Sequence, residues 1–332
     1  MSRIAVIGAG SWGTTAAALA ARTTSTVLWA RRPEVADHIN RDHHNPLYMP
    51  ECLLPDGLLA TAELGEALAG ATAVVMAVPS HGFRAVFSNA APAIGPASPI
   101  LSLTKGIEQQ TLATMTQVVA DVSPGHDPGL IGVLTGPNLA AEVATGQPTA
   151  AVIAFREPAA AVALQKVFMG PTFRVYTNDD VTGCELGGAI KNVMAIAAGM
   201  SDGLGFGDNT RATLITRALA ELSRLGIALG GRPSTFAGLA GMGDLIATCI
   251  STNSRNHRVG YGLARGQTLD EIVDEMKMVA EGIKTTRAVL DLAARHQIEM
   301  PIATHVGLVL YEGMHPREAV MKLMSRGAKS ED

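Results

Sequence analysis

The chain is poor in aromatic residues, poor in cysteine, and has no long uncharged apolar run. Aromatic side chains make up only 4% of the 332 residues while 47% are hydrophobic, so its cores must be mainly aliphatic and alanine-rich. The three cysteines, Cys52, Cys184 and Cys249, are scattered and form no CxxC pair. This pattern favours buried thiols in a reducing compartment over disulfides. No run of about 20 apolar residues is free of charges and glycine, so no membrane-embedded segment is expected.

An excess of positive charge is also missing. The net charge is −4 and the pI is near 6.1, which argues against a sequence-independent nucleic-acid binder. The first residues enter a strand-like run at once, without the features of a secretory signal, so a cytoplasmic protein is predicted. The nine histidines form no HExxH motif, and His43 and His44 lie in a Pro-rich loop, so no metal site is expected.

Short aliphatic runs recur through the first half and alternate with helical or loop segments. β-Branched runs that are continuously apolar are typical of strands covered on both faces of a parallel sheet. They occupy residues 4–7, 27–29, 73–78, 100–103, 130–134 and 150–154, and a further strand-like run covers residues 173–176. The sequence therefore predicts an α/β fold that starts with a Rossmann-type doubly wound sheet.

From about Thr182 the pattern is helical throughout. The predicted helices cover residues 187–198, 211–225, 238–248, 269–278, 285–294 and 303–311, and no strand-length run interrupts them. The chain is long enough for two cores. We predict a dinucleotide-binding Rossmann domain over residues 1–178 and an all-helical substrate and catalytic domain over residues 179–332.

A glycine motif follows the first strand directly. Gly8, Gly10 and Gly13 form a GxGxxG pattern that opens an alanine-rich helix. Such glycines permit a tight turn and let the backbone approach a pyrophosphate, which binds to the N–H groups of the helix. The alternative is a structural glycine turn, but the position between strand and helix predicts dinucleotide binding.

Basic residues follow two later strands. Arg31 and Arg32 stand roughly where an acidic residue would bind a ribose 2′-hydroxyl, and no carboxylate precedes Glu34. The pair suits a 2′-phosphate and so NADP(H), unless it only stacks on adenine or faces water. Lys105 also follows a strand. Because ligands of open parallel sheets bind outside the carboxyl ends of the strands, it either faces cofactor and anionic substrate or is a surface lysine.

Lys191 is the most informative residue of the second half, because it lies in an apolar helix rich in small residues. Its neighbours on the helical face are Gly187, Gly188, Met194 and Ala195, and because three of the four are Gly or Ala, the face leaves room for another group to lie against the ammonium. A buried lysine usually has a lowered pKa, which suits it to donate and accept protons. A lysine that reaches out of the core to water fits the same residues.

Further polar residues follow in the same half. Asp244 lies in a glycine-rich apolar segment, with Thr248 one helical turn later. Taken alone, Asp244 could equally be a helix N-cap. Ser254, Arg255 and Asn256 offer a hydroxyl, a guanidinium and an amide, a set that suits a phosphate dianion. A capped, solvated helix start would give the same string.

Seven separated motifs span both halves of the chain. They are Gly8-Ala-Gly-Ser-Trp-Gly13, Ser102-Leu-Thr-Lys-Gly-Ile-Glu108, Thr135-Gly-Pro137, Glu185-Leu-Gly-Gly-Ala-Ile-Lys-Asn192, Asp202-Gly-Leu-Gly-Phe-Gly-Asp-Asn209, Gly241-Met-Gly-Asp244 and Asn253-Ser-Arg-Asn256. In this order they resemble the bacterial type of NAD(P)-dependent sn-glycerol-3-phosphate dehydrogenase. The resemblance implies an oxidoreductase that interconverts dihydroxyacetone phosphate and sn-glycerol 3-phosphate with NADP(H) and/or NAD(H). It also implies a homodimer and a role in supplying phospholipid synthesis.

The resemblance also implies site residues. Lys191 would be the general acid and base, with Lys105 and Asp244 beside it. The implied substrate-binding residues are Lys105, Gly136, Asn138, Lys191, Asn192, Asp244, Thr248, Ser254, Arg255 and Asn256. The implied cofactor-binding residues are Gly8, Gly10, Ser11, Trp12, Gly13, Arg31, Arg32, Lys105, Ala140, Arg255, Val279 and Glu281.

One position departs from the family, and two other functions compete. Asn138 stands where the family usually has Ser or Thr, although an amide can still donate a hydrogen bond. The nearest rival is a related Rossmann and helical dehydrogenase for β-hydroxy acids or ketopantoate, which also uses a lysine of the helical domain. A nucleotide-sensing protein without turnover is a rival from another class, and the presence of Lys191 and Asp244 argues against it.

Overall fold

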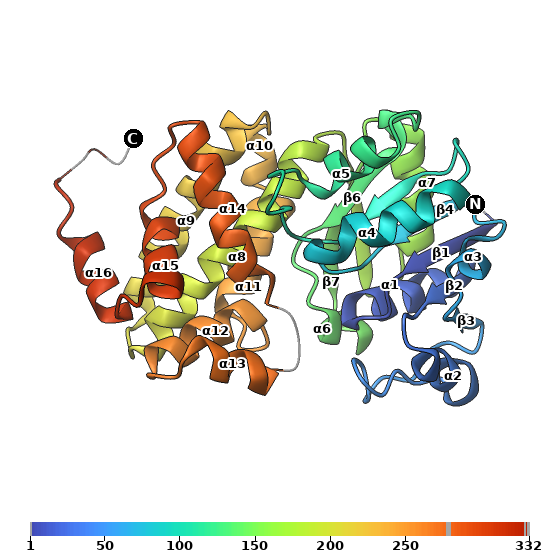
Figure 1. Cartoon of the computed structure of the whole chain (residues 1–332), viewed down its shortest axis with the longest axis horizontal. Coiled ribbons are helices and arrows are strands. Elements are labelled where there is room, and N and C mark those ends of the chain that lie inside the picture. The colour runs from blue at the N-terminus through green and yellow to red at the C-terminus, as the bar shows by residue number, and fades with distance from the viewer. Residues whose placement is uncertain (1, 277–279, 329, 331–332) are drawn as a thin grey trace.

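The computed structural model describes residues 2–276, 280–328 and 330. A half built on a β-sheet and a half built only of helices lie side by side (Figure 1). Strand β8 (Phe173–Asn178) is the last strand of the described residues, and helix α8 (Val181–Gly203) follows it. The predicted fold class, a doubly wound sheet followed by helices, is therefore confirmed.

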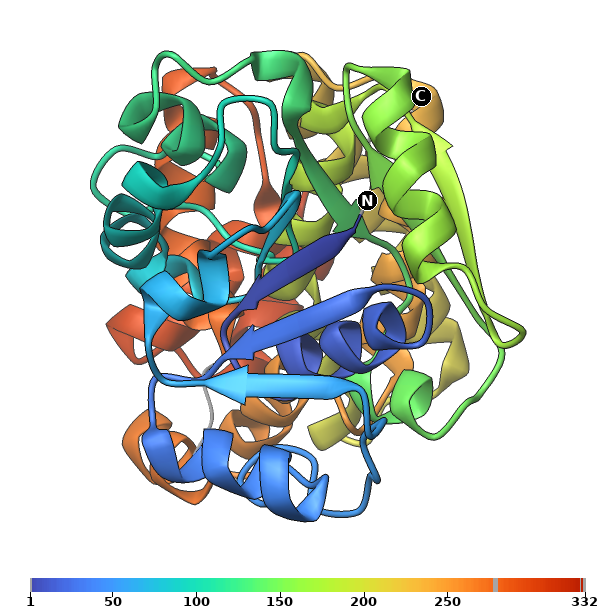
Figure 2. The ribbon, with the colours of Figure 1, turned by 90° about the vertical axis from the view of Figure 1, so that its right-hand side faces the viewer.

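One eight-stranded sheet forms the first half, in the order β3-β2-β1-β4-β5-β6-β7-β8 (Figure 2). Strands β1 to β6 are parallel to one another, so their carboxyl ends share one edge of the sheet. The other strands are β1 (Arg3–Ile7), β2 (Ser25–Trp29), β3 (Leu58–Thr61), β4 (Ala73–Met76), β5 (Ile100–Ser102), β6 (Ile131–Thr135) and β7 (Thr149–Ala154).

The sheet differs from the sequence prediction in two strands. β7 runs antiparallel to β6, and β8 is parallel to β7. The chain between β6 and β7 forms only the short helix α6 (Ala140–Ala144) rather than a crossover helix that would return it for a parallel pairing. Strand β3 was missed because it is an edge strand with alternating burial: Leu58 is 1% exposed and Leu59 57%.

Helices cover both faces of the sheet. In β1, Ile4 and Val6 pack in the layer with α1 (Ser11–Ala21) and α7 (Pro158–Phe168), whereas Ala5 and Ile7 pack on the opposite face. That second layer contains α3 (Leu64–Leu68), α4 (Ser80–Ala90) and α5 (Met115–Val122). Burial on both faces explains the continuously apolar strands.

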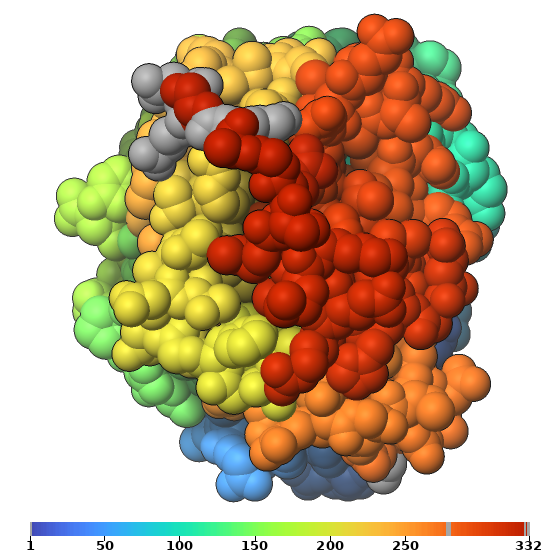
Figure 3. Space-filling view, turned by 90° about the vertical axis from the view of Figure 1, so that its left-hand side faces the viewer, coloured from blue at the N-terminus to red at the C-terminus, as the bar shows by residue number. Residues whose placement is uncertain are grey.

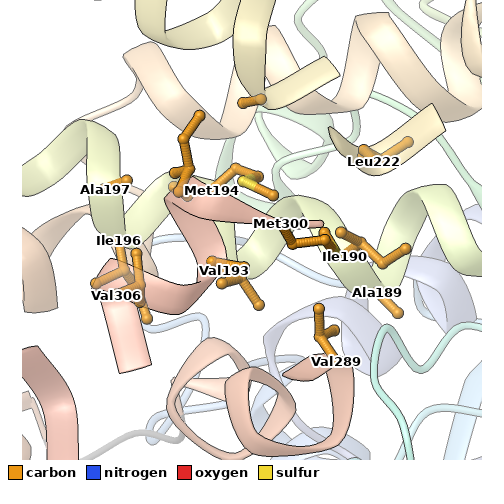
Figure 4. Close-up of a cluster of buried hydrophobic side chains, with 14 of the residues drawn as sticks. Ala189, Ile190, Val193, Met194, Ile196, Ala197, Leu222, Val289, Met300 and Val306 are labelled. Atoms are coloured by element: carbon orange, nitrogen blue, oxygen red, sulfur yellow. The ribbon is translucent and has the colours of Figure 1, made fainter. Parts of the chain in front are cut away.

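Helix α8 is the centre of the second half and is buried along almost its whole length. Its Ile190, Val193 and Met194 share one core with side chains of α9 (Asp208–Ala228), α14 (Glu281–Arg295) and α15 (Pro301–Glu312) (Figure 4). α8 crosses α12 (Arg255–Ala264) closely, because a Cβ on Gly199 would lie 1.9 Å from the carbonyl oxygen of His257. Only glycine permits so close a crossing.

The other helices complete the second half and its outer face. They are α10 (Pro233–Phe236), the π-helical turn η3 (Leu239–Gly243), α11 (Asp244–Ile250), α13 (Leu269–Met276) and α16 (Pro316–Met324). Figure 3 shows α9 in yellow beside the last helices in red. Among the described residues, no single helix has the length and apolarity of a membrane span, although the bent pair Pro233–Ile250 and Arg255–Ala264 does when taken together.

Candidate active site

Two lysines from different halves meet at one buried carboxylate. Asp244, the first residue of α11, is 1% exposed. Its Oδ1 lies 2.5 Å from Nζ of Lys191 on α8, and its Oδ2 lies 2.8 Å from Nζ of Lys105 in the loop after β5. Lys191 therefore does not reach out to bulk water. Two cations against one anion leave the cluster with an excess of positive charge when both lysines are protonated.

Glycines of α8 bring Asp244 to Lys191. A Cβ on Gly187 would lie 2.5 Å from the carbonyl oxygen of Ala240 in η3, the π-helical turn directly before Asp244. A Cβ on Gly188 would lie 2.8 Å from Oγ1 of Thr135. The room predicted beside Lys191 is therefore filled by other parts of the protein, namely Ala240 and Thr135. π-Helical turns are frequent at functional sites.

Two threonines fix the cluster. Lys191 Nζ donates to Thr248 Oγ1 at 2.5 Å, and Thr248 Oγ1 donates to the carbonyl oxygen of Asp244 at 2.6 Å. Thr135 Oγ1, at the end of β6, donates to Asp244 Oδ2 at 3.3 Å. These bonds hold the carboxylate in one orientation between the two ammonium groups.

Burial and charge shift two pKa values in the cluster. Burial lowers the pKa of Lys105 to about 8, although Asp244 opposes the shift. Burial alone would raise the pKa of Asp244, but the ammonium groups of Lys105 and Lys191 hold it below its ordinary value. The carboxylate therefore stays ionised near neutral pH.

Asn138 carries an unpaired donor next to Lys105. Lys105 Nζ donates to the carbonyl oxygen of Gly136 at 3.1 Å and to Asn138 Oδ1 at 2.8 Å. Because the ammonium needs an acceptor, Oδ1 must face it and Nδ2 must face elsewhere. That Nδ2 is buried without a hydrogen-bond partner among the described residues. An unpaired buried donor costs about 1–3 kcal/mol, so a ligand oxygen would fit here.

Asn192 and Asn256 connect several segments of the site. Asn192 Nδ2 donates to the carbonyl oxygen of Lys105 at 3.1 Å, and Asn256 Nδ2 donates to Asn192 Oδ1 at 3.0 Å. Asn256 Oδ1 accepts from the backbone N–H of Gly282 at 2.9 Å. These amides therefore bind one another and the backbone, and they tie the loop after β5 to α8, α12 and α14.

Ser254 and Arg255 begin helix α12. The hydroxyl of Ser254 accepts from the backbone N–H of His257 at 3.3 Å, so it caps the helix. This agrees with the alternative interpretation of these residues as a capped helix start. Ser254 itself is buried. Arg255 is the first residue of the helix, and burial lowers the pKa of its guanidinium.

The geometry of the GxGxxG loop fits a pyrophosphate. Gly8 has a φ of 117°, and a Cβ on it would lie 2.7 Å from the carbonyl oxygen of Ala77. A Cβ on Gly13 would lie 1.9 Å from the carbonyl oxygen of Gly8, whereas Gly10 faces open space. No side chain caps α1, and its first turn has no acidic residue. Its first N–H groups are thus placed to bind an anion.

Ser11, Trp12 and Ala140 surround the start of α1. Ser11 Oγ donates to the carbonyl oxygen of Tyr48 at 3.2 Å, and the ring of Trp12 lies 6.3 Å from that of Phe173. The carbonyl oxygen of Ala140 accepts from Thr15 of α1 at 3.4 Å. The structure thus brings these three predicted residues to the glycine loop, with the Trp12 ring packed against protein.

The remaining predicted cofactor residues lie further out. Arg31 and Arg32 are exposed beyond the end of β2, and neither pairs with a carboxylate of the described residues. Glu281, at the start of α14, accepts at Oε1 from the backbone N–H of Ser80 at 3.0 Å, and Ser80 Oγ donates to Oε2. Glu281 therefore bridges the two halves. Val279 lies outside the described residues.

Three residues of the site were not predicted. Thr135 is the last residue of β6, and Ser80 begins α4 shortly after β4, so their place at the carboxyl ends of strands could have singled them out. Asn45 is 0% exposed, and its Nδ2 donates to the carbonyl oxygen of Ala9 at 2.9 Å and to Thr14 Oγ1 at 2.8 Å. No sequence pattern marks Asn45, because its partners are more than 30 positions away. Over the described residues, no group of three or more His, Cys, Asp or Glu side chains could hold a metal ion.

Comparison with known proteins identifies the family of the chain. Residues 3–161 match the family model described as NAD-dependent glycerol-3-phosphate dehydrogenase N-terminus, and residues 180–321 match the model for its C-terminus. The chain belongs to the NAD-dependent glycerol-3-phosphate dehydrogenase family. A relative from Sphingopyxis alaskensis, named glycerol-3-phosphate dehydrogenase [NAD(P)+] 2, is 54% identical over 92% of this chain and 90% of its own length.

Solved structures separate the family from its rival. The crystal structure of glycerol-3-phosphate dehydrogenase from Coxiella burnetii has a TM-score of 0.93 at 39% identity, covering 98% of this chain and 99% of that one. A ketopantoate reductase from Ralstonia eutropha reaches a TM-score of 0.57 at 16% identity, covering 96% of this chain and 99% of that one. That second likeness shows the fold alone, so the ketopantoate alternative is only distantly related.

Proposed function

We propose that this glycerol-3-phosphate dehydrogenase family member interconverts dihydroxyacetone phosphate and sn-glycerol 3-phosphate with NAD(P)H. The observation that carries the proposal is the buried Asp244 carboxylate between the ammonium groups of Lys105 and Lys191. The cluster lies at the carboxyl edge of the sheet, where ligands of such folds bind. Relatives named glycerol-3-phosphate dehydrogenase [NAD(P)+] are similar to this chain over almost its full length, one of them at 54% identity over 92% of it.

Lys191 serves as the general acid and base. As hydride reaches the carbonyl carbon, its ammonium donates a proton to the developing alkoxide, and in the reverse direction the amine removes the proton of the 2-hydroxyl. The positive charge also stabilises the oxyanion before proton transfer is complete. Asp244 and Thr248 orient the ammonium through the bonds described above.

Lys105, Arg255 and the unpaired Nδ2 of Asn138 bind the phosphorylated substrate. A phosphate remote from the reacting carbon supplies binding energy that positions the carbonyl. Gly136, Asn192, Thr248, Ser254 and Asn256 complete this part of the site, chiefly by holding its backbone and charged groups in place.

The nicotinamide cofactor supplies or accepts the hydride. The glycine loop, with Gly8, Gly10 and Gly13, would hold its pyrophosphate on the N–H groups of α1. Ser11, Trp12 and Ala140 line the same region, and Arg31 and Arg32 would bind a 2′-phosphate of NADP(H). Glu281 adds a carboxylate from the helical half, and Val279 belongs to the same prediction.

The proposal also covers the two domains, the oligomeric state and the cellular location of the enzyme. Residues 1–178 act as the dinucleotide-binding domain and residues 179–332 as the substrate domain, so the site forms where the two meet. The enzyme works in the cytoplasm as a homodimer and supplies glycerol 3-phosphate for phospholipid synthesis. Sedimentation of the full chain tests the dimer.

Oxidation of NADPH and NADH, followed by absorbance, tests the activity. Dihydroxyacetone phosphate is compared with unphosphorylated dihydroxyacetone. Fast turnover confined to the phosphate ester is expected, because the phosphate supplies the positioning energy. Measurable NADPH binding without turnover on the ester would rule out this activity and lead to a panel of β-hydroxy acids and ketopantoate. Binding without turnover on any of these ketones would instead support a nucleotide sensor.

A further inference from the structure

A second cavity lies between the two halves, apart from the lysine cluster. It has a volume of about 350 Å³, within the size range of small-molecule sites. The first half lines it with the start of α5 and of β6, and the second half with the start of α8 and the ends of α9 and α14 (Figure 1). None of the substrate- or cofactor-binding residues proposed above lines it.

The inner wall of the cavity is apolar. Leu112, Ile131, Leu186 and Leu292 line it and are each less than 9% exposed. Leu112 and Ile131 come from the first half and Leu186 and Leu292 from the second, so both halves contribute to this wall. An apolar wall of this kind favours the carbon body of a ligand over a fully hydrated ion.

The rim of the cavity is basic. Arg156, which follows β7, and Arg295 and His296, at the end of α14, line it and are exposed. Within residues 2–276, 280–328 and 330, neither guanidinium forms an ion pair or a hydrogen bond with another side chain. No Asp or Glu lines the cavity.

The carboxylate of Glu185, which precedes Leu186 on α8, forms its hydrogen bonds with Thr116. It accepts from the backbone N–H of Thr116 at 2.9 Å and from the Thr116 hydroxyl at 2.5 Å, and the residue is 4% exposed. Among the described residues, Glu185 therefore forms no ion pair with Arg156 or Arg295, and burial raises the pKa of its carboxyl group, which disfavours a negative charge there. Thr111 and Gln117 add polar groups on the α5 side.

We propose that this cavity is a second binding site, for a small organic anion with a phosphate or carboxylate head and an aliphatic body. The head binds to Arg156 and Arg295, since guanidinium groups form strong charge-assisted bonds to such anions. The body packs on the wall of Leu112, Ile131, Leu186 and Leu292. Because both halves line the cavity, an occupant stabilises their association and raises the melting temperature.

Calorimetric titration of the full chain with n-butyl phosphate tests the site, with inorganic phosphate and butyrate as further probes. We expect butyl phosphate to bind and raise the melting temperature, and the Arg156→Gln/Arg295→Gln double variant to weaken binding by roughly tenfold per guanidinium. Arg217→Gln, an exposed arginine of α9 away from the cavity, is the matched control and should bind like the wild type. Butyrate should bind as well, and its failure to bind would remove the carboxylate head from the proposal.

A separate variant excludes binding at the lysine cluster. Arg255→Gln should leave cavity binding of butyl phosphate intact. If Arg255→Gln abolishes binding while the double variant does not, the ligand binds only at the substrate site and the inference is wrong. Equal losses in Arg217→Gln and in the double variant would show nonspecific charge attraction and also overturn it. If inorganic phosphate binds as tightly as butyl phosphate, the apolar wall does not contribute and the aliphatic body is removed from the proposal. If butyl phosphate does not bind at millimolar concentration, the proposed site is wrong.

Discussion

The lysine cluster and the glycine loop lie at the same edge of the sheet but are built in opposite ways, one from distant segments and the other from a single short segment. In the cluster, charges from distant segments are buried and paired: Lys105, Lys191 and Asp244 come from two halves of the chain. In the loop, one short segment leaves backbone N–H groups without a capping side chain. The difference teaches that a proton-transfer group must be held by the fold, whereas a phosphate site can be made by local backbone conformation.

The largest expected effect comes from removing the proton donor. Lys191→Met should lower kcat by at least about 10²-fold, because the alkoxide loses both its proton source and its counter-charge. Steady-state kinetics with dihydroxyacetone phosphate measure this loss, and NADPH titration should show unchanged cofactor affinity, since the glycine loop is separate. Near-normal turnover of the variant would remove Lys191 from the mechanism.

A pair of glycine variants tests the other side of the comparison. Gly13→Ala should destabilise the fold by about 1–3 kcal/mol, the usual cost of overpacking, because its Cβ would lie 1.9 Å from the carbonyl oxygen of Gly8. Gly10→Ala meets no atom within 4 Å, so it should leave the unfolding free energy unchanged but weaken cofactor binding where the pyrophosphate approaches. Denaturant unfolding and NADPH titration separate the two effects. Equal destabilisation by both variants would contradict this reading of the loop.

The pH dependence of kcat/KM should report the protonation of Lys105. With its pKa lowered by burial to about 8, the ammonium that binds the substrate is lost above that pH. The value of kcat/KM should then fall by up to about tenfold per pH unit above pH 8, because this parameter reports the free enzyme. Lys105→Arg should move the fall to higher pH.

Stability should change in the opposite direction, which separates titration from unfolding. Between pH 8 and the ordinary lysine value of 10.5, the unfolded chain binds the proton more tightly than the folded one. The contribution of Lys105 to the unfolding free energy therefore rises with pH in that window and is lost as the pH falls through 8. If kcat/KM decreases only at the pH where the protein unfolds, the deprotonation of Lys105 is not the cause of the decrease at alkaline pH.

The same contrast explains what the sequence could predict. Gly8 to Gly13 were identified correctly from a local pattern, and so were seven of the eight strands, six of them from their continuous apolarity. Strand β3 and the antiparallel direction of β7 were not predicted, because the exposure of an edge strand and the direction of a strand depend on neighbours distant in the chain. Lys191 was singled out by its apolar context, but its link to Asp244 spans 53 positions and came only from the family resemblance. Asn45 and the Glu281 bridge to Ser80 gave no local pattern at all.

The smallest expected effect concerns Asn138, whose Nδ2 is buried beside the lysine cluster without a hydrogen-bond partner among the described residues. If its Nδ2 donates to the substrate, Asn138→Asp should raise the KM for dihydroxyacetone phosphate by roughly tenfold or more, because an acceptor replaces the donor and adds repulsion. Asn138→Ser should stay within about threefold of the wild type, since a hydroxyl can still donate. Both substitutions keep an oxygen on the side chain that Lys105 contacts. Equal increases in KM for both variants would mean that the size of the amide, rather than its donor, sets the fit of the substrate.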